Sequence, residues 1–129
     1  MRVIAFGDKD FVPAGHESAT APGVLKKVLF QRNDLQQGSI QMVNWAKLLA
    51  GKSFAAHYHE DMQEIFIMMV GAARLTVGAK TVIMRPGDAV LIEPRETHQM
   101  WNDGERDAEY LAIGISGNTG GRTILAEQS

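Results

Sequence analysis

The sequence HYHEDMQEIFIMMVG, residues 57–71, places two histidines and a glutamate beside a run of apolar residues. Residues 64–70 have the length of a strand and are rich in Ile, Phe and Met. Both alternating positions of this run are apolar, so we expect the strand to lie inside a two-layer structure. The polar residues 60–63 predict a short loop that returns the chain from the strand carrying His57 and His59.

Further strands are expected on both sides of this stretch, because glycine and proline separate short runs rich in Val, Ile, Leu, Met and Phe. No segment has a long apolar period of 3.6 residues, so helix should be limited to single turns near a terminus or within 45–49. The pattern predicts an all-β sandwich or barrel. The expected strands span residues 23–32, 39–49, 53–59, 64–70, 72–77, 80–85, 89–92, 97–102 and 109–115.

The composition restricts the class of protein. The chain has 129 residues, which suits one domain, and its net charge of −2 argues against a nucleic-acid-binding protein. No apolar run approaches the ~20 residues that a membrane-spanning helix needs, and the first residues lack the apolar core of a signal peptide. The sequence contains no cysteine, which excludes disulfides and thiolate metal sites. We therefore expect a cytoplasmic protein that binds neither nucleic acid nor membrane.

Three of the four histidines form a candidate metal site. His57 and His59 are two residues apart in a predicted strand, so their side chains point to one face with Cα atoms about 7 Å apart. Glu64 opens the returning strand beside them, and His98 comes from a later strand. Three imidazoles and one carboxylate suit one Mn²⁺, Fe²⁺, Co²⁺, Ni²⁺ or Zn²⁺ ion and leave positions for water or substrate. His16 is assigned no role.

The residue spacing resembles the two motifs of the cupin superfamily. The first is Gly51-x5-His57-x-His59-x4-Glu64-x6-Gly71, and the second is Gly87-x10-His98-x3-Asn102. The resemblance covers residues 36–116 and is to small single-domain cupins, similar to the mannose-6-phosphate isomerase-like members. It implies an antiparallel jelly-roll β-barrel of six to eight strands, with one divalent metal ion in its mouth. His57, His59, Glu64 and His98 match the family's ligand positions.

The sequence departs from the second motif at one position. The family has a glycine three residues before the histidine of this motif, and here that residue is Arg95. The turn must therefore avoid a positive φ, or Arg95 adopts one at an energetic cost.

Outside the barrel we expect an N-terminal segment, 1–35, with one or two strands packed on the barrel or on a partner, and a tail, 117–129.

Alternation along the strands indicates the walls of a substrate pocket. Phe66 and Met68 are in phase with Glu64, Met100 is in phase with His98, and Tyr110 comes from the last long strand. The methionines suit either an adaptable pocket or simple core packing. Arg74 is expected to face solvent, because the apolar residues that follow Gly71 indicate a bend.

Two functions remain open from the sequence. The first is a metal-dependent enzyme, an isomerase, dioxygenase or decarboxylase, that acts on a small oxygen-rich or carboxylate metabolite. The second is a non-catalytic module that binds a sugar or another small molecule. Sugar-phosphate chemistry is less favoured, because the in-phase residues are apolar and phosphate recognition needs a basic pocket.

We also expect a homodimer, because Ile65, Ile67, Met69 and Trp101 point away from the metal site.

Overall fold

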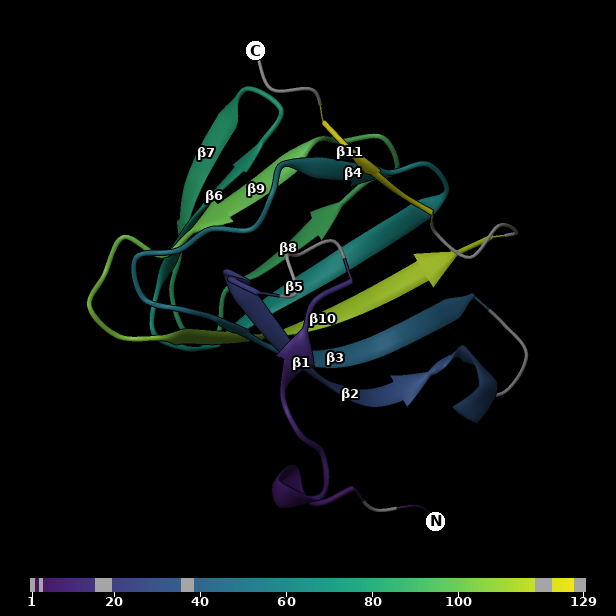
Figure 1. Ribbon diagram of the computed structural model, residues 1–129. Coiled ribbons are helices and arrows are strands. Elements are labelled where there is room, and N and C mark those ends of the chain that lie inside the picture. Colours follow the sequence, from purple (N-terminus) through teal and green to yellow (C-terminus); the bar gives the residue numbers. More distant parts are fainter. Residues whose placement is uncertain (1, 3, 16–19, 36–38, 118–121, 127–129) are drawn as a thin grey trace.

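Strands with alternating burial build two antiparallel sheets that face each other (Figure 1). The computed structural model describes residues 2, 4–15, 20–35, 39–117 and 122–126. The larger sheet has the order β1-β2-β3-β10-β5-β8, with β1 (Val12–Pro13), β2 (Val24–Gln31), β3 (Ile40–Leu48), β10 (Ala108–Ser116), β5 (Met62–Val70) and β8 (Ala89–Ile92). The smaller sheet has the order β11-β4-β9-β6-β7, with β11 (Thr123–Leu125), β4 (His57–His59), β9 (His98–Trp101), β6 (Ala73–Val77) and β7 (Lys80–Met84).

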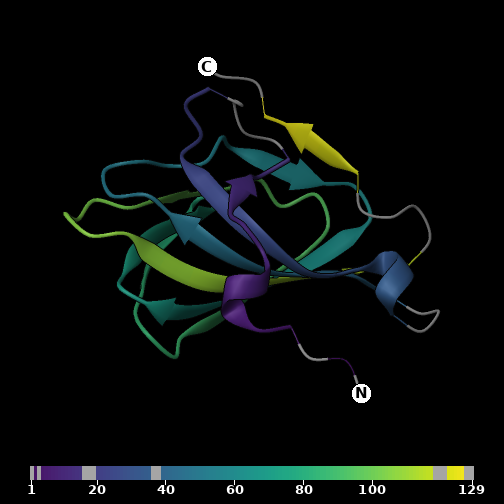
Figure 2. The ribbon, with the colours of Figure 1, turned by 60° about the horizontal axis from the view of Figure 1, so that its bottom comes forward.

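Helix is limited to two single 3₁₀ turns, η1 (Phe6–Asp8) and η2 (Arg32–Asp34). The first turn lies against the larger sheet (Figure 2). There the rings of Phe6 and Trp45 are in edge contact at a centroid distance of 5.7 Å. In the described part of the chain, neither turn has the length or the apolarity that crossing a bilayer requires. Residues 45–49, where a single helical turn was one expectation, belong mostly to β3.

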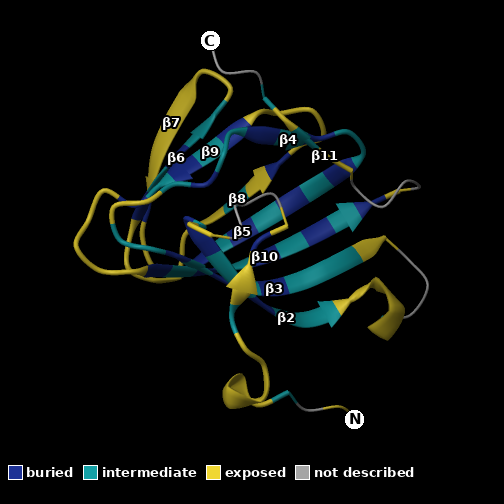
Figure 3. Cartoon of the chain, viewed as in Figure 1, coloured by how far each residue is buried: buried dark blue, intermediate teal, exposed yellow. Residues whose placement is uncertain are grey.

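The core lies between the two sheets and follows the two-residue period of the strands (Figure 3). Every second residue of β10 is buried, and Met62, Glu64, Phe66 and Met68 are the buried residues of β5. The outer residues of β5 differ from the expectation of burial on both faces. Ile65 and Ile67 are half-buried, and Met69 is 41% exposed, because β5 packs against the smaller sheet on one face only.

The predicted antiparallel jelly-roll architecture is confirmed, but the sheets do not close into a barrel. Among the described residues, strand pairing runs within each sheet and not between the two. The edge strands β7 and β8 belong to different sheets, and a turn at 85–88 joins them. In this turn the Asp88 N–H donates to the Arg85 carbonyl, and Gly87 has φ 92°, which glycine adopts without strain. The structure is therefore the sandwich form of the jelly roll.

The predicted strands all occur, with differences at their ends. Residues 53–56 precede β4 and carry only the isolated bridge between Ser53 and Trp101. The sequence allowed a second strand within residues 1–35 but gave no position for β1, and it did not predict β11, because two- or three-residue strands have no alternation to detect. The expected tail, 117–129, is described at 117 and 122–126, and β11 pairs there with β4.

Candidate metal centre

Three strands bring the four predicted ligand residues together. His57 and His59 lie on β4, and their two-residue spacing directs both side chains into the space between the sheets. His98 on β9 pairs directly with His57. Glu64 comes from β5 of the facing sheet, so the cluster joins the two layers. The short loop after β4 makes this possible by carrying the chain from one sheet to the other within a few residues.

The four side chains converge on one point. Each offers a nitrogen or oxygen atom that lies within 4.8 Å of the corresponding atoms of the others. Glu64 Oε1 is 3.4 Å from His59 Nε2 and 3.3 Å from His98 Nε2. The ring centroids of His57 and His98 are 4.4 Å apart. All four residues are buried, with at most 6% of any residue exposed.

The Nδ1 atoms of the histidines face hydrogen-bond partners on the outside of the cluster. His57 Nδ1 is 2.7 Å from the Ala55 carbonyl oxygen, and His98 Nδ1 is 2.9 Å from that of Glu96. A carbonyl only accepts hydrogen bonds, so Nδ1 carries a proton in both rings and Nε2 is the atom left to bind a metal. His59 Nδ1 is 3.1 Å from Thr123 Oγ1. The partners therefore orient each imidazole to present Nε2 as a ligand.

The buried polar atoms fit a metal ion. In the described part of the chain, His59 Nε2, Glu64 Oε1 and His98 Nε2 are buried without a hydrogen-bond partner. Buried polar atoms in native proteins are almost always satisfied, so three such atoms at one point indicate a missing bonding partner. Imidazole and carboxylate donors suit the divalent transition metals. The residues present thus form a donor set that a metal ion would complete.

Glu64 is ionised in this arrangement. Burial alone raises the pKa of Glu64, but its contacts with the His59 and His98 imidazoles outweigh burial and lower the pKa from 4.5 to about 2. At neutral pH the cluster therefore contains the full negative charge of the Glu64 carboxylate next to three imidazoles. A divalent cation balances this buried charge, which is a second reason why the site suits a metal.

Arg95 adopts the strained alternative that the sequence left open. Its φ is 69°, and it is the one non-glycine residue with positive φ in the described part of the chain. The Arg95 N–H donates to the His59 carbonyl at 2.7 Å, and the Glu96 N–H donates to the Glu93 carbonyl at 3.2 Å. The turn thus ties the β8–β9 connection to the strand that carries His59. Arg95 thus adopts the left-handed conformation that glycine adopts without strain.

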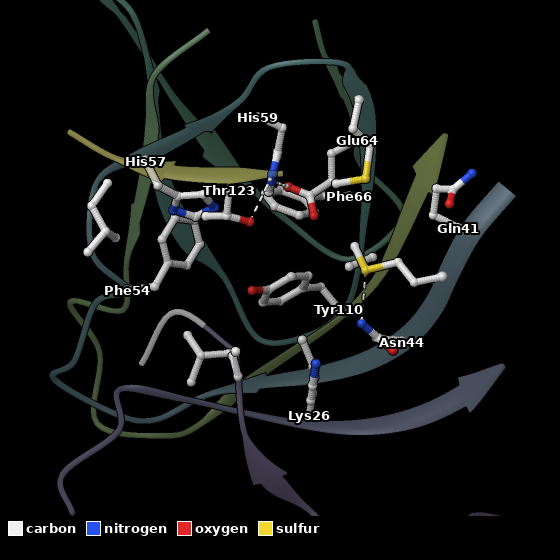
Figure 4. A pocket seen from close by; sticks show the side chains of 18 residues that line it. Lys26, Gln41, Asn44, Phe54, His57, His59, Glu64, Phe66, Tyr110 and Thr123 are labelled. Carbon is white, nitrogen blue, oxygen red and sulfur yellow. Dashed lines mark hydrogen bonds and ion pairs between the residues drawn. The ribbon is translucent and has the colours of Figure 1, made fainter. Parts of the chain in front are cut away.

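A pocket of about 530 Å³ opens beside the cluster, with His57, His59 and Glu64 in its wall (Figure 4). Of the residues expected to line a pocket, Phe66 and Tyr110 do so. Met68 and Met100 are fully buried in the core and are not among the lining residues, so their role is packing. Arg74 faces solvent, pairs with Asp103 at 2.9 Å and does not line this pocket.

Several lining residues were not predicted from the sequence. Lys26 comes from β2, Gln41 and Asn44 come from β3, and Thr123 comes from β11. The pairing of β2 with β3 and of β3 with β10 places the first three opposite the histidines, and no local pattern reveals such pairing. Thr123 lies in the expected tail, where its register opposite His59 places the hydroxyl on Nδ1. His16, which was assigned no role, lies outside the described residues.

Comparison with known proteins gives one family and several structural relatives. The family model described as Cupin domain matches residues 44–114. The oxalate-binding protein of Thermotoga maritima is 33% identical over 67 residues, which make up 52% of this chain and 55% of that protein. The chain therefore matches about half the length of this relative.

Two solved structures share the fold. The crystal structure of a predicted oxalate decarboxylase from Thermotoga maritima has a TM-score of 0.79 at 23% identity, and the alignment covers 90% of this chain and all of that one. A sugar phosphate isomerase of the cupin superfamily from Silicibacter pomeroyi has a TM-score of 0.78 at 21% identity, with 98% and 83% of the two chains covered. At these identities the likeness concerns the fold alone.

Proposed function

The chain belongs to the Cupin domain family, and we propose that it binds a small carboxylate or other oxygen-rich metabolite at a divalent transition metal ion. The observation that carries this proposal is the convergence of His59 Nε2, Glu64 Oε1 and His98 Nε2, which are buried at one point without hydrogen-bond partners. A cluster of this kind is costly in a folded protein unless something binds to it.

The ligands of the proposed metal are His57, His59, Glu64 and His98, with one Mn²⁺, Fe²⁺, Co²⁺, Ni²⁺ or Zn²⁺ ion per chain. Four protein donors leave further positions on an ion that prefers six, which is enough for a small molecule that binds through two oxygens. When bound, such an ion supplies Lewis-acid chemistry. The chain's own contribution is to hold three neutral imidazoles and one carboxylate in fixed orientations.

An acidic small molecule is the ligand class that the pocket favours. The relative from Thermotoga maritima is named an oxalate-binding protein, and this match suggests a carboxylate as the ligand. Among the described residues that line the pocket, Lys26 is the one cationic side chain outside the cluster. One lysine together with a divalent ion favours a carboxylate, whereas a sugar phosphate calls for a more basic pocket.

The pocket supports binding more directly than it supports a reaction. Outside the metal centre, Lys26 and Tyr110 are the titratable residues among the described lining, so the pocket offers few groups that could transfer a proton. We therefore favour a binding module, with a metal-dependent isomerase, dioxygenase or decarboxylase as the alternative. Turnover of the bound molecule by the metal-loaded protein would select the alternative.

The test of the proposed function is metal analysis of protein purified without a His tag, followed by calorimetric titration with oxalate at neutral pH. We expect about one ion per chain and oxalate binding that requires the ion. Histidines must be neutral to bind metal and ordinarily titrate near pH ~6.5, so metal affinity should fall below about pH 6. The variant His98→Ala should bind metal much more weakly. A wild type that binds none of the five ions would refute the proposal.

We further propose that the chain forms a homodimer through the outer face of the larger sheet. Ile65 and Ile67 are half-buried on this face, and Leu91 is 52% exposed beside them, since it pairs with Ile65. Trp101 does not belong to this surface. It lies on the smaller sheet, where the Arg74 guanidinium stacks on its ring at 4.4 Å. The cytoplasmic location and the division into residues 1–35, 36–116 and 117–129 also stay predictions.

A further inference from the structure

A polar group without a partner lies in the pocket, across from the histidines. Asn44 is 6% exposed and lines the pocket from β3. In the described part of the chain its Oδ1 has no hydrogen-bond partner, and its Nδ2 donates only to the sulfur of Met42, at 3.1 Å. Thioether sulfur is a weak acceptor, so the amide is almost unsatisfied. A buried amide in this state is costly unless a ligand completes its hydrogen bonds.

Lys26 lies on the same side of the pocket as Asn44. It is half-buried on β2, and it pairs with no carboxylate in the described part of the chain. Figure 4 shows both side chains on the wall opposite His57 and His59, with Tyr110 between the two walls. Asn44 pairs with Ala112, and Lys26 pairs with Ala46. Both alanines also line the pocket, and their small side chains leave room above the sheet.

The strand register gives the separation of this polar pair from the metal centre. Asn44 pairs with Ala112, and Ala112 pairs with Phe66, two residues beyond Glu64 on β5. Two strand spacings are ~10 Å and two residues along a strand are ~7 Å, so the Cα atoms of Asn44 and Glu64 are ~12 Å apart. Oxalate has two carbons and is short compared with this separation. A pocket of about 530 Å³ also has room for a considerably larger ligand.

We propose that Asn44 and Lys26 form a second polar subsite that binds a hydroxyl group at the far end of the metal-bound ligand. The ligand is then a hydroxylated carboxylic acid longer than oxalate. A hydroxyl group both donates and accepts, so it can donate to Asn44 Oδ1 and accept from the Lys26 ammonium group. The chain between the two ends contacts Phe54, Phe66 and Met62, which are apolar. This inference rests on the proposed metal-dependent binding, because the metal fixes the other end of the ligand.

The experiment compares two hydroxy acids that differ only at the far end. Both 2-hydroxyhexanoate and 2,6-dihydroxyhexanoate can bind a metal ion through the carboxylate and the 2-hydroxyl group, and only the second has a terminal hydroxyl. Calorimetric titration of the Co²⁺-loaded protein should show about ten-fold tighter binding of the dihydroxy acid, the effect of one buried hydrogen bond. Asn44→Leu should abolish this preference without weakening the binding of 2-hydroxyhexanoate or oxalate. Lys26→Met should reduce it.

Gln41→Leu is the matched control, because Gln41 lines the same pocket from the same strand but donates its amide to the carbonyls of Ser39 and Ser116. This variant should keep the preference. Asn44→Leu should be as stable as the wild type or more stable, since it removes an unsatisfied buried group. Asn44→Ala is a second variant with the same expected loss of preference.

Equal binding of the two hydroxy acids by a wild type that binds metal and oxalate normally would overturn the subsite alone. A marked loss of stability in Asn44→Leu would also overturn it, because the amide would then support the fold. Failure of the wild type to bind metal or oxalate would overturn the proposed function and the subsite with it.

Discussion

Replacing Arg95 by glycine should stabilise the protein, because Arg95 has a φ of 69° in the turn before His98. A residue with a Cβ atom in this left-handed conformation lowers the stability of the folded state by about 1–2 kcal/mol, and glycine removes this penalty. Glycine in turn makes the unfolded chain more flexible, which costs about 0.5–1 kcal/mol. The net effect is a gain of roughly 0.5–1 kcal/mol in the free energy of unfolding. The exposed Arg95 side chain contributes little that would change this balance.

The assay is urea denaturation of the metal-free protein. The metal content of each variant is measured in parallel on protein that has not been stripped of metal. Arg95→Ala is the control, because it removes the same side chain but keeps the Cβ atom, so its stability should stay close to that of the wild type. Metal content should not change in either variant, since the N–H of residue 95 still donates to the His59 carbonyl. An Arg95→Gly variant that is less stable than the wild type, or that gains no more than Arg95→Ala, would refute the reasoning.

Three further predictions concern the site and the assembly. The folded pKa of Glu64, about 2, lies below the unfolded value of 4.5, so its contribution to the stability of the metal-free protein is complete above pH 4.5 and is lost as the pH falls toward 2. Glu64→Gln should show a smaller loss of unfolding free energy in this window, and an identical loss would contradict the assignment. Thr123→Val removes the hydroxyl that faces His59 Nδ1 and should weaken metal binding about 10–100-fold, whereas Thr123→Ser should retain it. Light scattering should show a dimer that Leu91→Glu dissociates, and a wild type that is only a 14.1 kDa species at micromolar concentration would argue against this interface.

The sequence predicted those parts of the fold and site that depend on short-range periodicity. His57 and His59 share a face because of their two-residue spacing, and the polar loop after them returns the chain to Glu64. No local spacing links His98 to the other three residues, so its placement rested on its strand and on the second motif, and the structure pairs it directly with His57. The four residues lie together in the structure, and their role as metal ligands stays a prediction.

Long-range pairing explains what the sequence could not predict. Lys26 and Asn44 reach the pocket because β2, β3 and β10 pair in a particular register, and no local pattern encodes that register. Met68 was correctly expected on the inner face. The pocket, however, extends along β5 only from Met62 to Phe66, so Met68 lies beyond it in the core. Alternation therefore predicts which face a residue occupies and leaves open how far the pocket extends along that face.

The central claim is that the histidine cluster binds a metal ion, and the metal content of the double variant His57→Ala/His59→Ala tests it most directly. The account predicts about one ion per chain in the wild type and none in the double variant, since only Glu64 and His98, on different sheets, would remain. His16→Ala is the control, because His16 lies outside both motifs. Far-UV circular dichroism should show that the strands persist, because the core consists of apolar side chains. A folded double variant that still holds one ion per chain would contradict the account.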